Sequence, residues 1–244
     1  MKNLPKTILC IGECMVEMAP REDGAYTRGF AGDTFNSAWY LARTLPDEFT
    51  VDYFTGAGTD TVSDEMLTFM EKAGVGTASV RRIEERTVGL YMIALKNGER
   101  SFSYWRGQSA AKLLAEDPGA LGKALAGKGL VLFSGITMAV VNEEHRRTLL
   151  DLLAEARAAG TVIAFDPNMR ARLWSSREVM AETIMKAAAV SDITNAISCK
   201  ASCKARCTHN AARRRNGGAA ALWRSCEQRR RPCCEDLWCE IRDG

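Results

Sequence analysis

The stretch "GLVLFSGI", residues 129–136, decides the fold class. Apolar side chains occupy both alternating positions from Leu130 to Phe133, which is typical of a strand buried on both faces of a parallel sheet. An amphipathic helix is predicted over 142–160, with Asn142 as its N-cap and Gly160 as its stop. Residues 161–170 predict a second buried strand with a polar C-terminal end. Strand, helix and strand in this order indicate a parallel sheet.

The same alternation extends through most of the chain. Residues 49–58 predict a strand that ends in glycines, and 61–74 a helix that ends at Gly74. Residues 180–193 predict a helix, but the strand expected after this helix is not found in the sequence pattern. We therefore expect a doubly wound α/β fold that has lost its C-terminal strands.

Two segments do not fit a parallel sheet. After a buried start, residues 7–18 continue with an alternation that lifts the chain out of the sheet, and residues 87–107 predict a hairpin around Lys96-Asn97-Gly98. We assign segments 14–31 and 87–107 to a small β lid.

Composition divides the chain near residue 193. Residues 194–244 hold 11 of the 33 basic residues, 5 of the 30 acidic residues and seven of the nine cysteines. We interpret this segment as a non-homologous tail, aberrant or disordered, of the kind that out-of-frame reading produces. A metal module on Cys199, Cys203, Cys207 and His209 and a nucleic-acid-binding tail remain alternatives.

The stretch "GFAGDTFNSAWYLAR", residues 29–43, predicts a helix that begins after a tight turn at Gly32. Asp33 or Thr34 can cap it. Free N–H groups at a helix start favour phosphate, but the Asp33 carboxylate and the Asn36 amide suit a ligand rich in hydroxyl groups. An ordinary capped helix without a ligand is the alternative.

Polar residues also follow the strand predicted at 161–170. Ligands of doubly wound sheets bind beyond the carboxyl ends of the strands. This rule places Asp166, Asn168 and Arg170 at the expected site.

Five stretches together resemble the ribokinase-like (PfkB) carbohydrate kinases over residues 7–193. They are "IGECMVEM" at 11–18, "AGDTFNSAWYLAR" at 31–43, "TGAGTDTVSDEM" at 55–66, "GLYMIALKNGERSFSYWR" at 89–106 and "DPNMRARLW" at 166–174. The resemblance is strongest to the branch that acts on 2-keto-3-deoxygluconate. Ala31 replaces the first glycine of the family's Gly-Gly pair, which is tolerable only where that position avoids positive φ.

The resemblance implies an ATP-dependent kinase for a sugar acid, with Mg²⁺ at the phosphates and no metal ligands among the site residues. It implies a substrate site formed by Gly32, Asp33, Thr34, Phe35, Asn36, Tyr91, Tyr104, Arg106 and Arg170, with Asp166 and Asn168 at the phosphate end. The two arginines suit the carboxylate of the sugar acid. Family members are often homo-oligomers.

The family's Asp-Thr-x-Gly-Ala-Gly-Asp signature, which supplies the catalytic base, does not occur in this sequence. Its only Gly-Ala-Gly lies at 56–58, and we interpret the nearby Asp60 as a helix cap rather than the base. We therefore expect an inactive chain. Alternatives are a non-catalytic sugar-binding fragment and a kinase for another sugar such as fructose or ribose.

Composition and the N-terminal residues predict a cytoplasmic protein with a small-molecule substrate, without a membrane segment or a specific nucleic-acid partner. Cys10 and Cys14 are predicted to be reduced core thiols, and His145 is expected to face solvent. Glu13 is assigned either to the sugar site or to the edge of the core.

Overall fold

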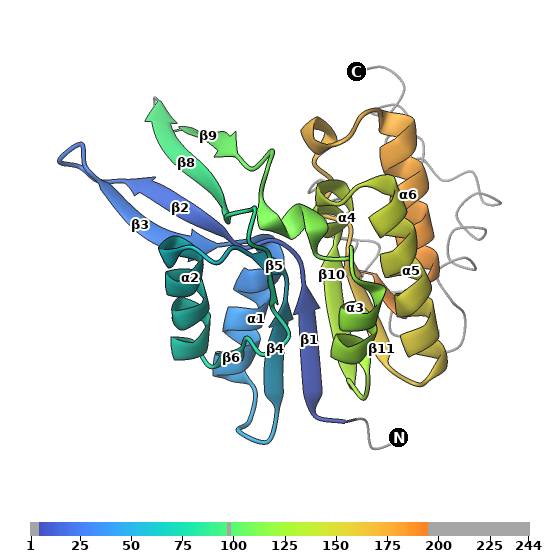
Figure 1. The fold of residues 1–244 in the computed structure, drawn as a ribbon. Helices are drawn as coiled ribbons and strands as arrows, with labels where there is room; N and C mark the ends of the chain where they lie inside the picture. The colour runs from blue at the N-terminus through green and yellow to red at the C-terminus, as the bar shows by residue number, and fades with distance from the viewer. Residues whose placement is uncertain (1–4, 97–98, 195–244) are drawn as a thin grey trace, which may run out of the picture.

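The computed structural model describes residues 5–96 and 99–194. Figure 1 shows a body, in which helices flank a central sheet, and a lid of strands that extends from one end of that sheet. The interpretations of residues 195–244 lie outside the described residues.

A parallel sheet forms the centre of the body, in the order β12-β11-β10-β1-β4-β6. Its strands are β1 (Thr7–Ile11), β4 (Thr50–Phe54), β6 (Val75–Gly76), β10 (Leu130–Ser134), β11 (Val162–Asp166) and β12 (Ile193–Thr194). Successive strands lead outward from β1 on one side and from β10 on the other, so the strand order reverses between β1 and β10. The predicted doubly wound fold is confirmed.

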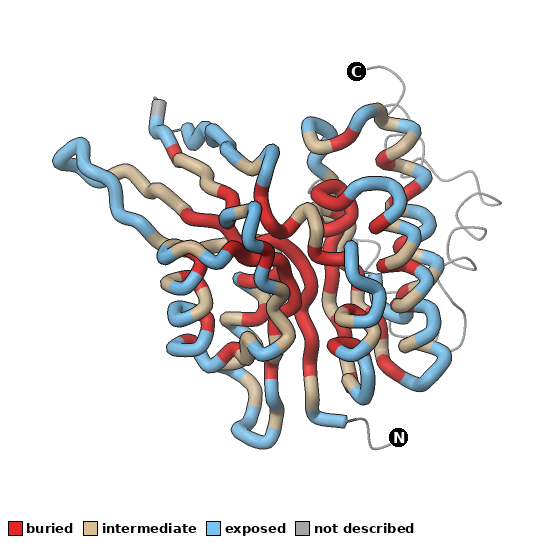
Figure 2. Tube along the Cα trace, in the orientation of Figure 1, coloured by how far each residue is buried: buried red, intermediate tan, exposed pale blue. Residues whose placement is uncertain are grey.

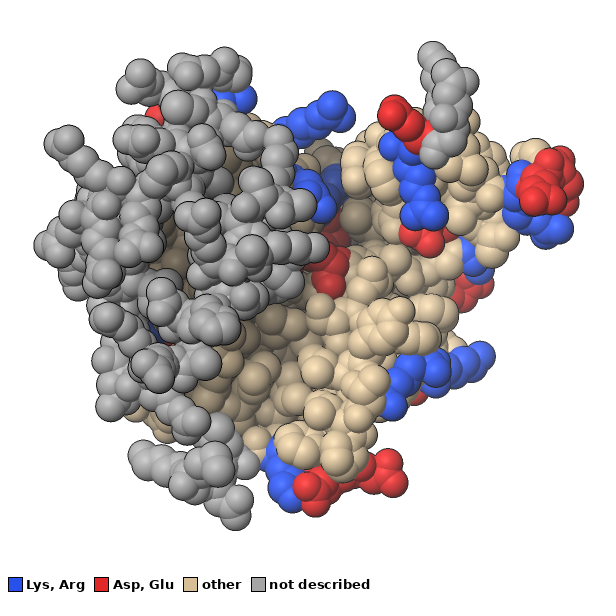
Figure 3. Space-filling model, turned by 180° about the vertical axis from the view of Figure 1, so that it is seen from behind, with Lys and Arg blue, Asp and Glu red and all other residues tan. Residues whose placement is uncertain are grey.

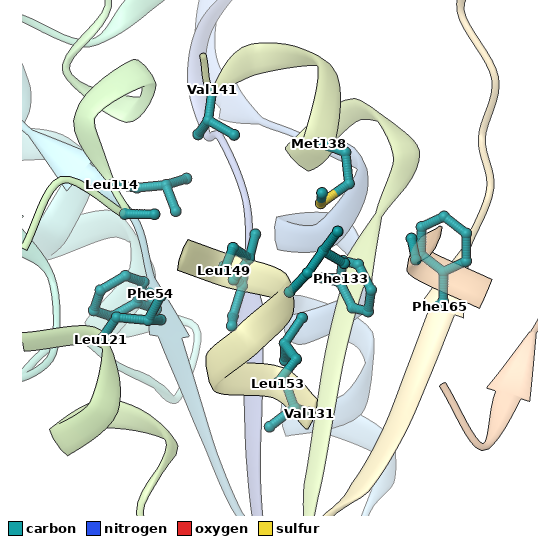
Figure 4. Packing of buried hydrophobic residues seen from close by; sticks show 14 of the residues in the cluster. Phe54, Leu114, Leu121, Val131, Phe133, Met138, Val141, Leu149, Leu153 and Phe165 are labelled. Atoms are coloured by element: carbon teal, nitrogen blue, oxygen red, sulfur yellow. The ribbon is translucent and has the colours of Figure 1, made fainter. Parts of the chain in front are cut away.

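Helices cover both faces of this sheet. They are α1 (Asp33–Thr44), α2 (Thr61–Lys72), α3 (Pro118–Leu125), α4 (Gly135–Val140), α5 (Glu143–Ala158) and α6 (Arg177–Ala189), with the 3₁₀ turns η1 (Ala110–Leu113) and η2 (Ala171–Leu173). In β1, Ile8 and Cys10 belong to the core cluster under α1 and α2. Leu9 and Ile11 belong to the opposite cluster, which also contains Phe133, Phe165 and the buried leucines of α5 (Figure 4). Burial on both faces explains why these strands are apolar throughout.

The lid is a second sheet, in the order β3-β2-β8-β9. Its strands are β2 (Met15–Pro20), β3 (Tyr26–Ala31), β8 (Gly89–Lys96) and β9 (Glu99–Trp105), and β8 and β9 form the predicted antiparallel hairpin. A smaller sheet pairs β5 (Gly56–Ala57) with β7 (Arg81–Arg82). Seen from behind, charged side chains lie mainly along the lid and the rim of the body (Figure 3).

Helix boundaries follow the predicted capping residues in two places. Asn142 accepts a hydrogen bond from the His145 amide at the start of α5, and Gly74 has φ +81° just after α2. The prediction that no strand follows α6 is wrong, because Ile193 and Thr194 form the short strand β12, which pairs with β11. A strand of two residues is too short to give a recognisable hydrophobic pattern in the sequence.

His145 does not face solvent as expected, because the first turn of α5 packs against η1. The residue is buried, and its Nδ1 lies 3.4 Å from the carbonyl oxygen of Lys112. Cys10 and Cys14 are buried and unpaired, as predicted. Within the described residues, no helix is long and apolar enough to cross a membrane.

Candidate functional site

The predicted site lies where the strand order reverses, at the carboxyl ends of β1, β10 and β11. Gly12 directly follows β1, and its amide donates to the Phe54 carbonyl. A Cβ on Gly12 would overlap the hydroxyl of Thr34 and approach that of Thr137 to 2.9 Å. Glycine thus allows α1 and α4 to approach this edge of the sheet.

The start of α1 differs from the capping prediction. Gly32 is the N-cap, its backbone is extended, and no side chain caps the helix. Asp33 instead accepts a 2.8 Å hydrogen bond from the Asn168 side chain, and the Thr34 hydroxyl is 2.8 Å from the Tyr53 hydroxyl. Both side chains are drawn away from the helix N–H groups by partners distant in sequence, which a local capping rule does not include.

Gly32 is required for a reason other than a tight turn. A Cβ at this position would overlap the carbonyl oxygen of Glu13. Ala31 lies in β3 without positive φ, so its replacement of a family glycine causes no backbone strain.

The next two predicted substrate residues have different environments. Phe35 is 1% exposed and meets Tyr53 edge to face at 5.6 Å between ring centroids. Asn36 is exposed and lines a surface hollow of about 330 Å³ together with Glu17, Phe30, Ala31, Phe35, Trp39, Tyr40 and Phe69. Their roles in substrate binding, and that of the buried Thr34, stay predictions.

The end of β11 carries the second group of predicted residues. Asp166 accepts a 3.2 Å hydrogen bond from the backbone amide of Asn168. Among the described residues, Asn168 is the only non-glycine residue with a positive φ, at 27°. The side chain of Asn168 then reaches Asp33. Partial burial raises the pKa of Asp166, the neighbouring Asp33 carboxylate raises it further, and the exposed Arg170 opposes this shift.

The lid contributes an aromatic face. Tyr91 and Tyr104 are paired across β8 and β9, with ring centroids 5.9 Å apart. The Arg106 guanidinium carbon lies 5.9 Å from the Tyr104 ring, so the expected common side of Tyr104 and Arg106 is confirmed. The Tyr91 hydroxyl donates a hydrogen bond to Glu17. The pKa of Tyr91 is raised, mainly by burial and in addition by the hydrogen bond to Glu17 and its negative charge.

Glu13 forms contacts that the sequence left open. It is 2% exposed, makes an ion pair with Arg106 and accepts a hydrogen bond from the Ser109 hydroxyl. Burial raises the pKa of Glu13, although Arg106 and Ser109 oppose the shift. Its position two residues after an apolar strand indicated an edge residue, but its partners are about 95 positions away in sequence.

Asp60 is the N-cap of α2 and accepts from the amides of Val62 and Ser63, each at 3.1 Å. These contacts agree with the interpretation as a cap. The described residues hold no group of three or more His, Cys, Asp or Glu side chains able to hold a metal.

The described edge presents side chains typical of a polar small-molecule site. Carboxylates and amides come from α1 and from the end of β11 with the segment after it, a cation comes from that same segment, and tyrosines with a second cation come from the lid. In doubly wound α/β proteins, this edge of the sheet is where small-molecule ligands bind.

Sequence comparison specifies this class further. Residues 5–196 match the profile described as "pfkB family carbohydrate kinase". The chain therefore belongs to the pfkB family of carbohydrate kinases.

Similar proteins include several kinases. The chain is 40% identical over 192 residues to the 2-dehydro-3-deoxygluconokinase of Dickeya dadantii (strain 3937), covering 77% of this chain and 62% of that protein. It is 43% identical over 180 residues to the 2-dehydro-3-deoxygluconokinase of Escherichia coli (strain K12), covering 72% and 58%. The chain thus spans about three fifths of the length of these relatives.

A solved structure has a similar fold. The crystal structure of fructokinase with bound ATP from Xylella fastidiosa has a TM-score of 0.68 and 26% identity, covering 78% of this chain and 57% of that one.

Proposed function

We propose that this chain is the sugar-binding part of an ATP-dependent kinase for 2-keto-3-deoxygluconate, also called 2-dehydro-3-deoxygluconate. The observation that carries the proposal is the hydrogen bond between Asn168 and Asp33, because it joins the start of α1 to the end of β11. Together they present polar groups suited to sugar hydroxyls. The names of the Dickeya and Escherichia relatives support the choice of sugar.

Each group has a role in this proposal. Asp33 accepts hydrogen bonds from the sugar hydroxyls, Asn36 both accepts and donates them, and Arg170 pairs with the carboxylate in the geometry that guanidinium favours. Arg106 adds a second cation at the lid. Tyr91 and Tyr104 cover the sugar from the lid side and exclude water from the reacting hydroxyl.

Phosphoryl transfer depends on positioning and on stabilisation of the phosphate charge. ATP is the proposed phosphoryl donor, in keeping with the ATP-bound relative. Mg²⁺, when bound, would neutralise phosphate charge, and Asp166 with Asn168 are the residues proposed beside the phosphates. Because the family signature that holds the base is not found in the sequence, we propose that the chain binds the sugar acid without phosphorylating it.

Two assays on the chain test this proposal. Isothermal titration should show binding of 2-keto-3-deoxygluconate, weaker binding of fructose and ribose, and a loss of about tenfold or more on Arg170→Ala. Arg172→Ala, a neighbouring arginine, is the control and should retain affinity. A coupled assay with ATP and Mg²⁺ should show no turnover.

The alternatives give different results. Tighter binding of fructose or ribose would make that sugar the proposed ligand in place of 2-keto-3-deoxygluconate. Turnover of any of the three sugars would contradict the expected inactivity. No binding of any of the three sugars by a folded chain would overturn the proposed function.

A further inference from the structure

The chain passes between body and lid four times within the described residues. These crossings are residues 12–14 between β1 and β2, Gly32 between β3 and α1, residues 83–88 between β7 and β8, and residues 106–109 between β9 and η1. Figure 2 shows buried backbone where the lid meets the body. A side chain at this junction can influence how the two sheets are oriented.

Glu13 contacts or borders all four crossings. Its carboxylate pairs with Arg106 and accepts from Ser109, both on the last crossing. A Cβ on Gly89, the first residue of β8 directly after the third crossing, would lie 3.0 Å from Glu13 Oε1. The glycine at position 32 leaves room for the Glu13 carbonyl. Glu13 is therefore the common neighbour of the connections that carry the lid.

Arg106 connects this buried anchor to the aromatic face of the lid. Its side chain is 13% exposed, and its guanidinium lies beside Tyr104 as well as Glu13. A guanidinium has five N–H donors, so an ion pair with one carboxylate leaves donors for a second. One cation can thus be held by Glu13 and still meet an anionic ligand.

Stability gives no sufficient reason for such a pair. Burying two charges costs solvation free energy, and apolar replacements of buried ion pairs are often neutral or stabilising. The second cation near Glu13, Lys112, donates to the Val140 carbonyl and adds only a longer-range attraction. A role for Glu13 in holding the Arg106 guanidinium in position gives a reason for burying both charges.

We propose that Glu13 is a positioning residue that fixes Arg106 and the lid in the geometry that receives the carboxylate of the sugar acid. This inference rests on the proposed function. It assigns Glu13 no contact with the sugar, because the side chain is buried. Its effect on the ligand passes through the Arg106 guanidinium.

The test compares Glu13→Gln with the unmodified chain by two measurements. Hydrogen exchange should show β8 and β9 amides exchanging about tenfold faster in the variant, because the lid loses its anchor. Titration should show binding of 2-keto-3-deoxygluconate weakened about tenfold or more. Binding of the uncharged amide of the same sugar should be weakened less, since the amide makes no ion pair with Arg106.

The matched control is Asp52→Asn, which removes a partly buried ion pair between Asp52 and Lys128 near the amino end of the sheet. It should alter neither lid exchange nor sugar-acid affinity. Ser109→Ala is the second variant, should Glu13→Gln fail to fold. It removes one hydrogen bond to Glu13 and leaves the ion pair, so it should cause the same changes to a smaller extent.

Unchanged lid exchange and unchanged sugar-acid affinity in Glu13→Gln or Ser109→Ala would overturn the inference. So would an equal loss for the sugar acid and its amide, which indicates a merely structural role. If the unmodified chain binds neither compound, the proposed function fails and the role toward the carboxylate fails with it. Hydrogen exchange of the lid in the same samples then shows separately whether Glu13 anchors the lid: faster exchange in Glu13→Gln supports the anchor, and unchanged exchange contradicts it.

Discussion

The hydroxyl pair of Thr34 and Tyr53 connects the first turn of α1 to β4 inside the core. Both residues are buried, and the two oxygens lie 2.8 Å apart. A hydroxyl without its partner is costly in such surroundings, whereas an apolar pair of similar shape is not. Burial also keeps the pKa of Tyr53 well above its ordinary value, so this hydroxyl remains protonated.

We expect Tyr53→Phe to lower the free energy of unfolding by about 1–3 kcal/mol, because the Thr34 hydroxyl is left buried and unpaired. Thr34→Val should do the same. The double variant should lose less than the sum of the two, which urea unfolding of the four chains would measure. Additive losses would mean that the hydroxyls do not interact.

Asp60 gives a prediction about pH. Desolvation opposes its ionisation, but hydrogen bonds from the Ser63 side chain and amide more than compensate and lower its pKa. A carboxyl with a depressed pKa in the folded state adds stability above its unfolded pKa of about 3.9, and this stability is lost as pH falls through the folded value.

Asp60→Ala should therefore cost about 1 kcal/mol at neutral pH, while Asp60→Asn retains the cap and costs less. The difference in stability between the unmodified chain and Asp60→Asn should shrink as pH is lowered below about 4. Urea unfolding over a pH series measures this trend. A difference that grows toward acid pH would contradict the depressed pKa.

At the scale of the elements, two glycines in different settings should respond in opposite directions to alanine. Gly12→Ala brings a Cβ against hydroxyls on α1 and α4 and should destabilise by about 1–3 kcal/mol. Gly122 lies inside α3 with open space around it, so Gly122→Ala should stabilise by about 0.5–1 kcal/mol. Thermal unfolding of both variants would show the opposite signs, and equal signs would contradict the packing at Gly12.

The elements were predictable where the signal is local. The hairpin of β8 and β9, the cap at Asn142 and the apolar strand β10 each follow from neighbouring residues. The partners of Thr34, Glu13 and His145 were not, because these contacts join residues 19 to 96 positions apart. Pairing at that separation depends on how the sheet is wound, which no local pattern contains.

The candidate site divides in the same way. The rule for strand ends placed Asp166 and Asn168 at the carboxyl edge, and strand parity placed Tyr104 beside Arg106. The contact of Asn168 with Asp33 depends on tertiary packing over 135 positions. The ion pair of Arg106 with Glu13 depends on the junction of two sheets.

For the whole molecule, stability and binding are expected to reside in different parts. The large buried clusters lie on the two faces of the body sheet, whereas β9 is exposed along its length. Substitutions on the lid face should therefore change ligand affinity with little effect on unfolding, and core substitutions the reverse.

Tyr104 and Trp105 test this division as neighbours on opposite faces of β9, with exposed fractions of 51% and 58%. Each change to alanine should alter the free energy of unfolding by no more than about 0.5 kcal/mol, since little burial is lost. Under the proposed function, Tyr104→Ala should weaken 2-keto-3-deoxygluconate binding about fivefold or more, because Tyr104 shares the face of Arg106 and Tyr91. Trp105→Ala should leave the affinity unchanged. Equal losses in titrations of the two variants would place the ligand elsewhere on the lid, because only a ligand on the tyrosine face distinguishes two neighbours of such similar exposure.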